Sequence, residues 1–110
     1  MNEGESAMGN LIKVANKNDL APGKAISASV NNKEIAIFNI DGKFYAIDNE
    51  CTHAGGPLCE GELGGTTVTC PWHGATFDVA SGAALGAPAF TGVCSYKVHV
   101  EGDEIKVEMP

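Results

Sequence analysis

The sequence contains no arginine and few basic residues of any kind. Its seven basic residues are all lysines, against fourteen aspartates and glutamates, which gives a formal net charge of −7. Nucleic acids and anionic membrane surfaces attract proteins of the opposite charge. The charge balance therefore argues against both as partners, and a basic protein is the more plausible partner.

Long apolar runs are missing as well. No stretch approaches the ~20 apolar residues that a membrane-spanning helix needs. Residues 1–9 lack the positively charged start and apolar segment of an export signal, so we expect a mobile tail and a cytosolic location. Residues 10–110 suffice for one small domain with a single core, which we expect to be a monomer.

Sustained helical periodicity is the third absence. Short β-prone runs alternate with turn residues, which predicts an all-β fold. The clearest pair is Glu34–Ile40 and Lys43–Ile47, because Asp41-Gly42 between them suits a two-residue hairpin turn. Gly61–Gly65 is expected to be a turn, and Gly86–Phe90 an irregular loop. Further strands are expected at Leu11–Val14, Ala25–Val30, Thr66–Thr69, Phe77–Val79, Tyr96–Val100 and Glu104–Glu108.

Two short segments hold most of the metal-binding side chains. Cys51-Thr52-His53 and Cys70-Pro71-Trp72-His73 each pair one thiol with one imidazole. Zinc sites commonly place two cysteines on one hairpin and two histidines on another element, whereas here the types are mixed within each segment. A 2Fe-2S cluster with unequal irons fits, with two cysteines on one iron and two histidines on the other. One alternative, of a different class, is a structural zinc-binding interaction domain. The other is that no metal is bound, with the cysteines buried as apolar residues and the histidines on the surface.

The other cysteines and the third histidine lie outside these segments. Cys94, in the apolar run Val93–Val98, is expected to be a packed strand residue, and Cys59 to be more exposed. In a reducing cytosol both are expected to be thiols. Strand alternation places His99 on the solvent face, so we read it as a surface residue.

With their flanks, Cys51–Leu58 and Cys70–Asp78, the two segments resemble the Rieske family. The resemblance covers residues 11–108 and implies an antiparallel β-sandwich or barrel with a smaller cluster-binding subdomain at about residues 44–85. It implies that one Rieske-type 2Fe-2S cluster is held by Cys51, His53, Cys70 and His73. It also implies that Nε2 of each histidine lies at the surface as the electron exit. Pro88 stands where the family has a loop covering the cluster from a third side, and an ordinary connecting loop is the alternative.

The chain departs from the high-potential respiratory members at four positions. Those members have a Ser and a Tyr hydroxyl after the second motif, where this chain has Ala75 and Phe77, and a disulfide where it has Gly56 and Trp72. In those members the two hydroxyl groups donate hydrogen bonds to the cluster sulfurs, which is one of the factors that set the potential. Because this chain lacks both hydroxyls, we expect a midpoint potential in the negative part of the range of roughly −150 to +300 mV. Trp72 and backbone amides are expected to hold the loops in place of the disulfide.

No second catalytic centre is expected in the chain. A mononuclear oxygenase iron needs two histidines and a carboxylate, whereas only His99 remains, and no flavin or nicotinamide motif is present. The resemblance implies a non-enzymatic electron carrier, similar to the ferredoxins of bacterial aromatic-ring dioxygenase systems. It would pass electrons from a flavin-dependent NAD(P)H reductase to a terminal oxygenase. The small subunit of an assimilatory nitrite reductase, or another stand-alone Rieske module, is the alternative.

Both protein partners are expected to dock near His53 and His73. Four acidic residues lie in sequence beside the first motif and would place negative charge near that face: Asp48, Glu50, Glu60 and Glu62. The alternative is that they are ordinary solvated loop residues.

Overall fold

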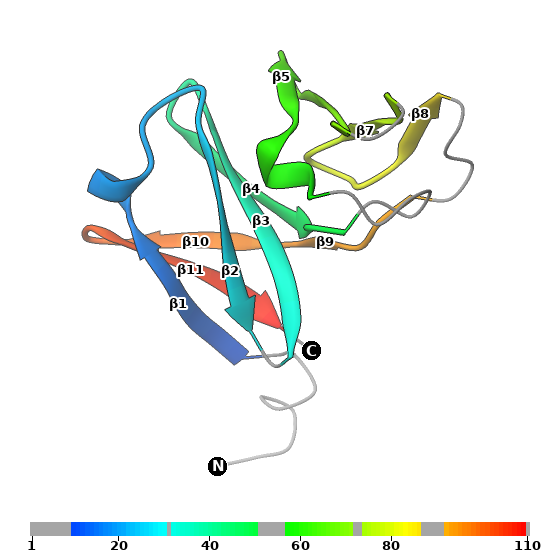
Figure 1. The fold of residues 1–110 in the computed structure, drawn as a ribbon. Coiled ribbons are helices and arrows are strands. Elements are labelled where there is room, and N and C mark those ends of the chain that lie inside the picture. Colours follow the sequence, from blue (N-terminus) through cyan, green and yellow to red (C-terminus); the bar gives the residue numbers. More distant parts are fainter. Residues whose placement is uncertain (1–9, 31, 51–56, 72–73, 87–91, 110) are drawn as a thin grey trace.

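The computed structural model describes residues 10–30, 32–50, 57–71, 74–86 and 92–109, which form three antiparallel sheets (Figure 1). The only helical elements in those ranges are two 3-10 turns, η1 (Lys17–Asp19) and η2 (Leu58–Glu60), so the all-β prediction is confirmed. No helix in the described ranges is long and apolar enough to cross a membrane. The predicted tail, residues 1–9, lies outside the described residues.

Two of the sheets form the larger part of the molecule. The outer sheet has the order β1 (Asn10–Asn16), β11 (Glu104–Met109) and β10 (Val98–Glu101). The central sheet has the order β2 (Ala25–Val30), β3 (Lys33–Ile40), β4 (Lys43–Asp48) and β9 (Ser95–Tyr96). Figure 1 shows the outer sheet crossing beneath the central one.

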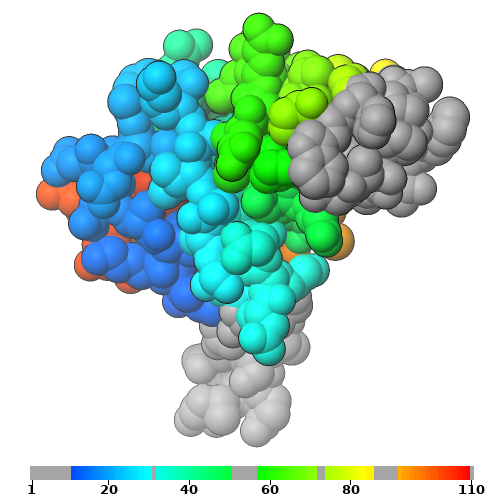
Figure 2. Space-filling model, viewed as in Figure 1, coloured from blue at the N-terminus to red at the C-terminus, as the bar shows by residue number. Residues whose placement is uncertain are grey.

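The third sheet, here called the small sheet, lies on the other side of the central sheet (Figure 1). Its order is β5 (Glu62–Gly64), β6 (Thr67–Thr69), β7 (Thr76–Asp78) and β8 (Ala84–Gly86). In Figure 2 its green residues lie at the top of the view, next to the blue and cyan residues. All its strands have three residues, so it depends on the neighbouring sheet for a core.

Strand β3 is buried on both faces, which explains its nearly continuous apolar sequence. Ile35 and Ile37 pack with Ile105 and Val107 of the outer sheet. Ala36 and Phe38 point the other way, into a second core that is shared with the small sheet. The central sheet is therefore the layer that both other sheets are built on.

The hairpin between β3 and β4 is confirmed. Asp41 and Gly42 have φ of 53° and 90°, the positive values that a two-residue turn of the primed type needs. The strands pair in register from Ile35 opposite Asp48 to Ile40 opposite Lys43. This register fixes where β4 ends, three residues before the first motif cysteine.

Three expectations about the strands were wrong in detail. Within Gly61–Gly65, residues 62–64 form strand β5, because Leu63 lies opposite Val68 and packs into the second core. Gly86 ends β8 opposite Thr76 instead of belonging to an irregular loop. The expected strand Tyr96–Val100 is broken at Lys97, where the chain passes from the central sheet to the outer sheet.

The two cysteines outside the motifs were also assigned the wrong way round. Cys94 is exposed and precedes strand β9, whereas Cys59 is half-buried and packs against the second core. Both are free thiols, as expected. The prediction for His99 is confirmed, since it is exposed on β10 with its Nε2 3.3 Å from the Glu108 carboxylate.

Candidate metal centre

Three of the nine residues predicted for the cluster and its surroundings belong to the described part of the chain: Cys70, Ala75 and Phe77. The other six lie outside the described residues: Cys51, His53, Gly56, Trp72, His73 and Pro88. The structure thus describes the segments from which the predicted loops start and to which they return.

The second motif starts at the end of β6 and leads back into β7. The Cys70 amide donates a hydrogen bond of 2.7 Å to the carbonyl oxygen of Ala75, which closes the loop at its base. Gly74, just before Ala75, has φ of 77°, a conformation that glycine adopts without strain. The hairpin therefore turns within a few residues of Cys70.

The first motif is closed by Asn49, the residue that follows β4. Its carbonyl oxygen accepts a hydrogen bond of 2.7 Å from the Leu58 amide, and its side-chain oxygen accepts one of 2.8 Å from the Cys59 amide. The Asn49 amide donates to Glu34 on β3, 2.9 Å away. Asn49 is 9% exposed, so a buried residue ties the start of η2 to the end of β4.

The bases of both loops meet in the second core. Leu58, which follows the first loop, belongs to the same buried cluster as Cys70, Ala75 and Phe77. All four side chains are at most 1% exposed. The small sheet and η2 therefore bring two segments that are separate in sequence to one apolar site.

The surroundings of Cys70 fit a metal centre. Burial among apolar groups destabilises a thiolate unless a positive charge lies nearby. A metal ion or cluster would supply it, and cysteine thiolate is the ligand type that iron–sulfur clusters use.

Ala75 and Phe77, which pack in the same buried cluster as Cys70, place no hydroxyl group in that cluster. Ala75 and Phe77 are both fully buried, and neither carries a hydrogen-bond donor on its side chain.

Burial raises the pKa of the Cys59 thiol, and hydrogen bonds to Ser27 and Asn49 partly offset this increase. Cys59 is therefore a neutral thiol at neutral pH.

The acidic residues near the first motif fall into two groups. Asp48 is hydrogen-bonded to Tyr96 and lies 3.6 Å from the Lys33 ammonium, so its charge is compensated. Glu50, Glu60 and Glu62 are exposed, and within the described residues they form no ion pair. These three are the acidic residues near the first motif that remain available to a partner.

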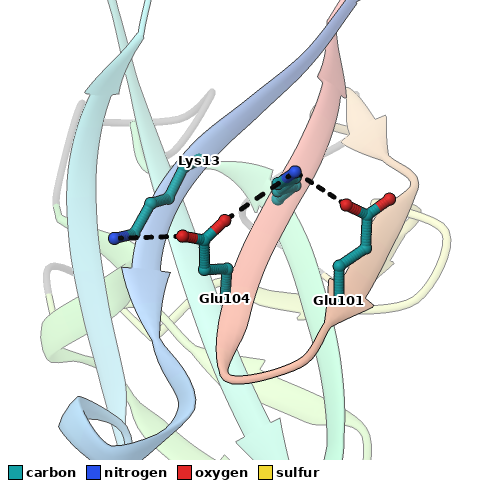
Figure 3. A network of polar contacts seen from close by, with 4 residues as sticks. Lys13, Glu101 and Glu104 are labelled. Atoms are coloured by element: carbon teal, nitrogen blue, oxygen red, sulfur yellow. Dashed lines mark hydrogen bonds and ion pairs between the residues drawn. The ribbon is translucent and has the colours of Figure 1, made fainter.

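The outer sheet, by contrast, compensates its own charges. Figure 3 shows a row of alternating charges in which Glu104 lies between Lys13 and Lys106, and Lys106 lies between Glu104 and Glu101, with nitrogen to oxygen distances of 2.7 to 3.8 Å. The hydrogen bond to Lys106 lowers the pKa of Glu101, and the same bond raises the pKa of Lys106. The uncompensated acidic side chains around the first motif therefore lie on a different part of the molecule.

Sequence reasoning missed the roles of Asp48, Asn49 and Tyr96. Their partners lie 10 to 48 residues away along the chain, so no local pattern announces them. The one available signal was the polar pair Asp48-Asn49 at the end of an apolar strand, directly before the first motif.

Comparison with known proteins gives a consistent result. The family model described as the Rieske 2Fe-2S domain matches residues 10–97. The ferredoxin component of the naphthalene 1,2-dioxygenase/salicylate 5-hydroxylase systems of Ralstonia sp. is 36% identical over 100 residues, covering 91% of this chain and 96% of the relative.

Two solved structures are similar in fold and sequence. The ferredoxin of carbazole 1,9a-dioxygenase from Nocardioides aromaticivorans IC177 has a TM-score of 0.88 and 32% identity, covering 92% of this chain and 99% of that chain. A ferredoxin-like chain in a complex of reduced oxygenase and oxidized ferredoxin of carbazole 1,9a-dioxygenase has a TM-score of 0.83 and 30% identity, with 89% and 92% covered.

Proposed function

Because this chain belongs to the Rieske 2Fe-2S domain family, we propose that it is a cytosolic one-electron carrier, the ferredoxin component of an aromatic-ring dioxygenase system. The observation that carries this proposal is the match over nearly the whole length of both chains to ferredoxins of such systems. The chain holds one Rieske-type 2Fe-2S cluster, and its fold is that of the stand-alone ferredoxins.

The ligand set is part of the proposal. Cys51 and Cys70 bind one iron of the cluster, and His53 and His73 bind the other. The burial of Cys70 and the closed bases of both loops support this assignment. Gly56, Trp72, Ala75, Phe77 and Pro88 form the surroundings of the cluster, within a cluster-binding subdomain at about residues 44–85.

The bound cluster takes up and releases one electron at a time. The residues of this chain exclude water on the core side of the site, since Cys70, Ala75 and Phe77 are buried there. They also leave the histidine Nε2 atoms as the proposed exit for the electron. The chain itself performs no chemistry on a substrate in this proposal, and it acts through its partners.

The proposed partners are a flavin-dependent NAD(P)H reductase and a terminal oxygenase. The oxygenase is supported by the similar ferredoxin whose structure is a complex with an oxygenase. The exposed carboxylates of Glu50, Glu60 and Glu62 favour a partner surface that is basic. The carrier works as a monomer that meets each partner in turn.

The proposal is tested by purifying the protein without chelators and measuring iron and acid-labile sulfide. We expect two of each per chain, as the family description implies, and a reduced EPR signal of the His-ligated type. Reconstitution with a dioxygenase reductase and oxygenase should then restore product formation that depends on this protein. A colourless protein with one zinc per chain would refute the proposal.

Ala75 and Phe77 have no hydroxyl group, and this predicts a low midpoint potential for the cluster. We expect a midpoint in the negative part of the range of roughly −150 to +300 mV, and a wild-type midpoint above about +100 mV would contradict this. Ala75→Ser and Phe77→Tyr should each raise the midpoint by about 60 to 130 mV, because a hydrogen bond to a charged group contributes about 1.5–3 kcal/mol. Protein-film voltammetry on the intact protein measures this shift.

The matched control for these variants is Val79→Thr. Val79 is fully buried in the same core, so the variant adds a buried hydroxyl at a position that the resemblance does not place next to the cluster. Its midpoint should equal that of the wild type. Equal midpoints for all three variants would show that residues 75 and 77 do not contact the cluster sulfurs.

A further inference from the structure

The carboxylate of Asp48 connects the end of strand β4 to a distant part of the chain. Asp48 is the last residue of β4, three residues before the proposed ligand Cys51. Its side chain is bonded to residues that lie 46 and 48 positions further along. These residues belong to the segment that follows residues 87–91, where the proposed cluster-covering Pro88 is located.

Both oxygens of the carboxylate are used in this connection. The Tyr96 hydroxyl donates to Oδ1 over 2.6 Å, and the Cys94 amide donates to Oδ2 over 3.2 Å. The Asp48 amide in turn donates to the Cys94 carbonyl oxygen, 2.9 Å away. Three hydrogen bonds thus join one residue to the segment Cys94–Tyr96.

Lys33 completes the group. Its ammonium lies 3.6 Å from Asp48 Oδ1 and 5.8 Å from the centre of the Tyr96 ring. The hydrogen bond to Tyr96, together with the charge of Asp48, raises the pKa of Lys33, so the lysine stays protonated at neutral pH. Burial and the bond to Asp48 raise the pKa of Tyr96, which keeps its hydroxyl a donor.

The same segment is fastened to the small sheet at its other end. The Val93 amide donates to the Gly82 carbonyl oxygen in the turn between β7 and β8, 2.8 Å away. On the opposite side of residues 87–91, Gly86 pairs with Thr76 on β7. Asp48 therefore links the strand that leads into the first motif with the return of the chain from residues 87–91.

We propose that Asp48 is a positioning residue of the cluster site, which holds the end of β4, three residues before the proposed ligand Cys51, against the segment Cys94–Tyr96. This inference rests on the proposed function. Its consequence is that the environment of the cluster depends on a hydrogen bond between Asp48 and Tyr96, although neither residue is a proposed ligand.

The test compares Tyr96→Phe and Asp48→Asn with the wild-type holoprotein. Tyr96→Phe removes one hydroxyl and no charge, so any effect on the cluster cannot come from a changed net charge. We expect amide hydrogen exchange in residues 92–96 to become roughly tenfold faster. We also expect a changed visible circular dichroism spectrum, changed reduced EPR g-values and a shifted midpoint potential in both variants.

The control is Asp41→Asn, which removes one carboxylate from the exposed turn between β3 and β4, where asparagine tolerates the positive φ. It should leave the spectra and the potential unchanged. Faster exchange in Tyr96→Phe with unchanged spectra and potential would overturn the positioning role. A colourless wild-type protein would overturn the proposed function and this inference with it. The two failures are therefore distinguishable.

Discussion

Replacing His53 or His73 by cysteine is expected to abolish the Rieske-type spectrum. Each change substitutes a thiolate for a neutral imidazole, which adds a negative charge to the cluster and leaves one histidine instead of two among its ligands. The reduced EPR signal should lose the g-values of a cluster with two histidine ligands, or the protein should lose its iron. Iron analysis and EPR on the purified variants distinguish these two results from an intact Rieske centre.

The third histidine provides the control. His99 is exposed on the outer sheet, where its Nε2 lies 3.3 Å from the Glu108 carboxylate. His99→Cys makes the same chemical change away from the proposed site and should leave colour, EPR signal and potential as in the wild type. An unchanged spectrum in His53→Cys or His73→Cys would refute ligation by that histidine.

The parts of the fold that the sequence predicted are those set by local chemistry. Asp41-Gly42 has one favourable conformation, so the β3–β4 hairpin and its register follow from a few neighbouring residues. Strand β5 was missed because three residues are too few to show alternation. The break at Lys97 was missed because residues 95–101 alternate between polar and apolar side chains like one continuous strand, although they divide between two sheets.

The same distinction holds at the site. The proposed ligands could be predicted because each motif places thiol and imidazole within four residues. Their supports could not, since Asn49 bonds to Cys59 and Asp48 to Tyr96 only after the sheets have assembled. Cys94 was predicted wrongly for a related reason. Its apolar neighbours suggested that it is buried, but its amide bonds to Asp48 and its side chain is exposed.

Among substitutions that add one methyl group to a glycine in the described part of the chain, Gly82→Ala is expected to lower the free energy of unfolding the most. Gly82 is buried with φ of 80°, and a Cβ there would overlap the carbonyl oxygen of Val93. The positive φ costs about 1–3 kcal/mol for a residue other than glycine. Separating the two segments would also break the bond from the Val93 amide to Gly82, which leaves buried polar groups unpaired at about 1–3 kcal/mol.

Gly42→Ala separates the two causes, because Gly42 has φ of 90° but open space where its Cβ would lie. It should lower the free energy of unfolding by the conformational cost alone, about 1–3 kcal/mol, and leave the visible spectrum unchanged. Gly82→Ala should cost at least about 1 kcal/mol more in chemical denaturation and should release the cluster faster on heating. Equal losses in the two variants would mean that the Val93 segment moves aside freely. In that case the turn at Gly82 would contribute little to holding Val93, and the bonds to Asp48 would be the main attachment of the segment Cys94–Tyr96.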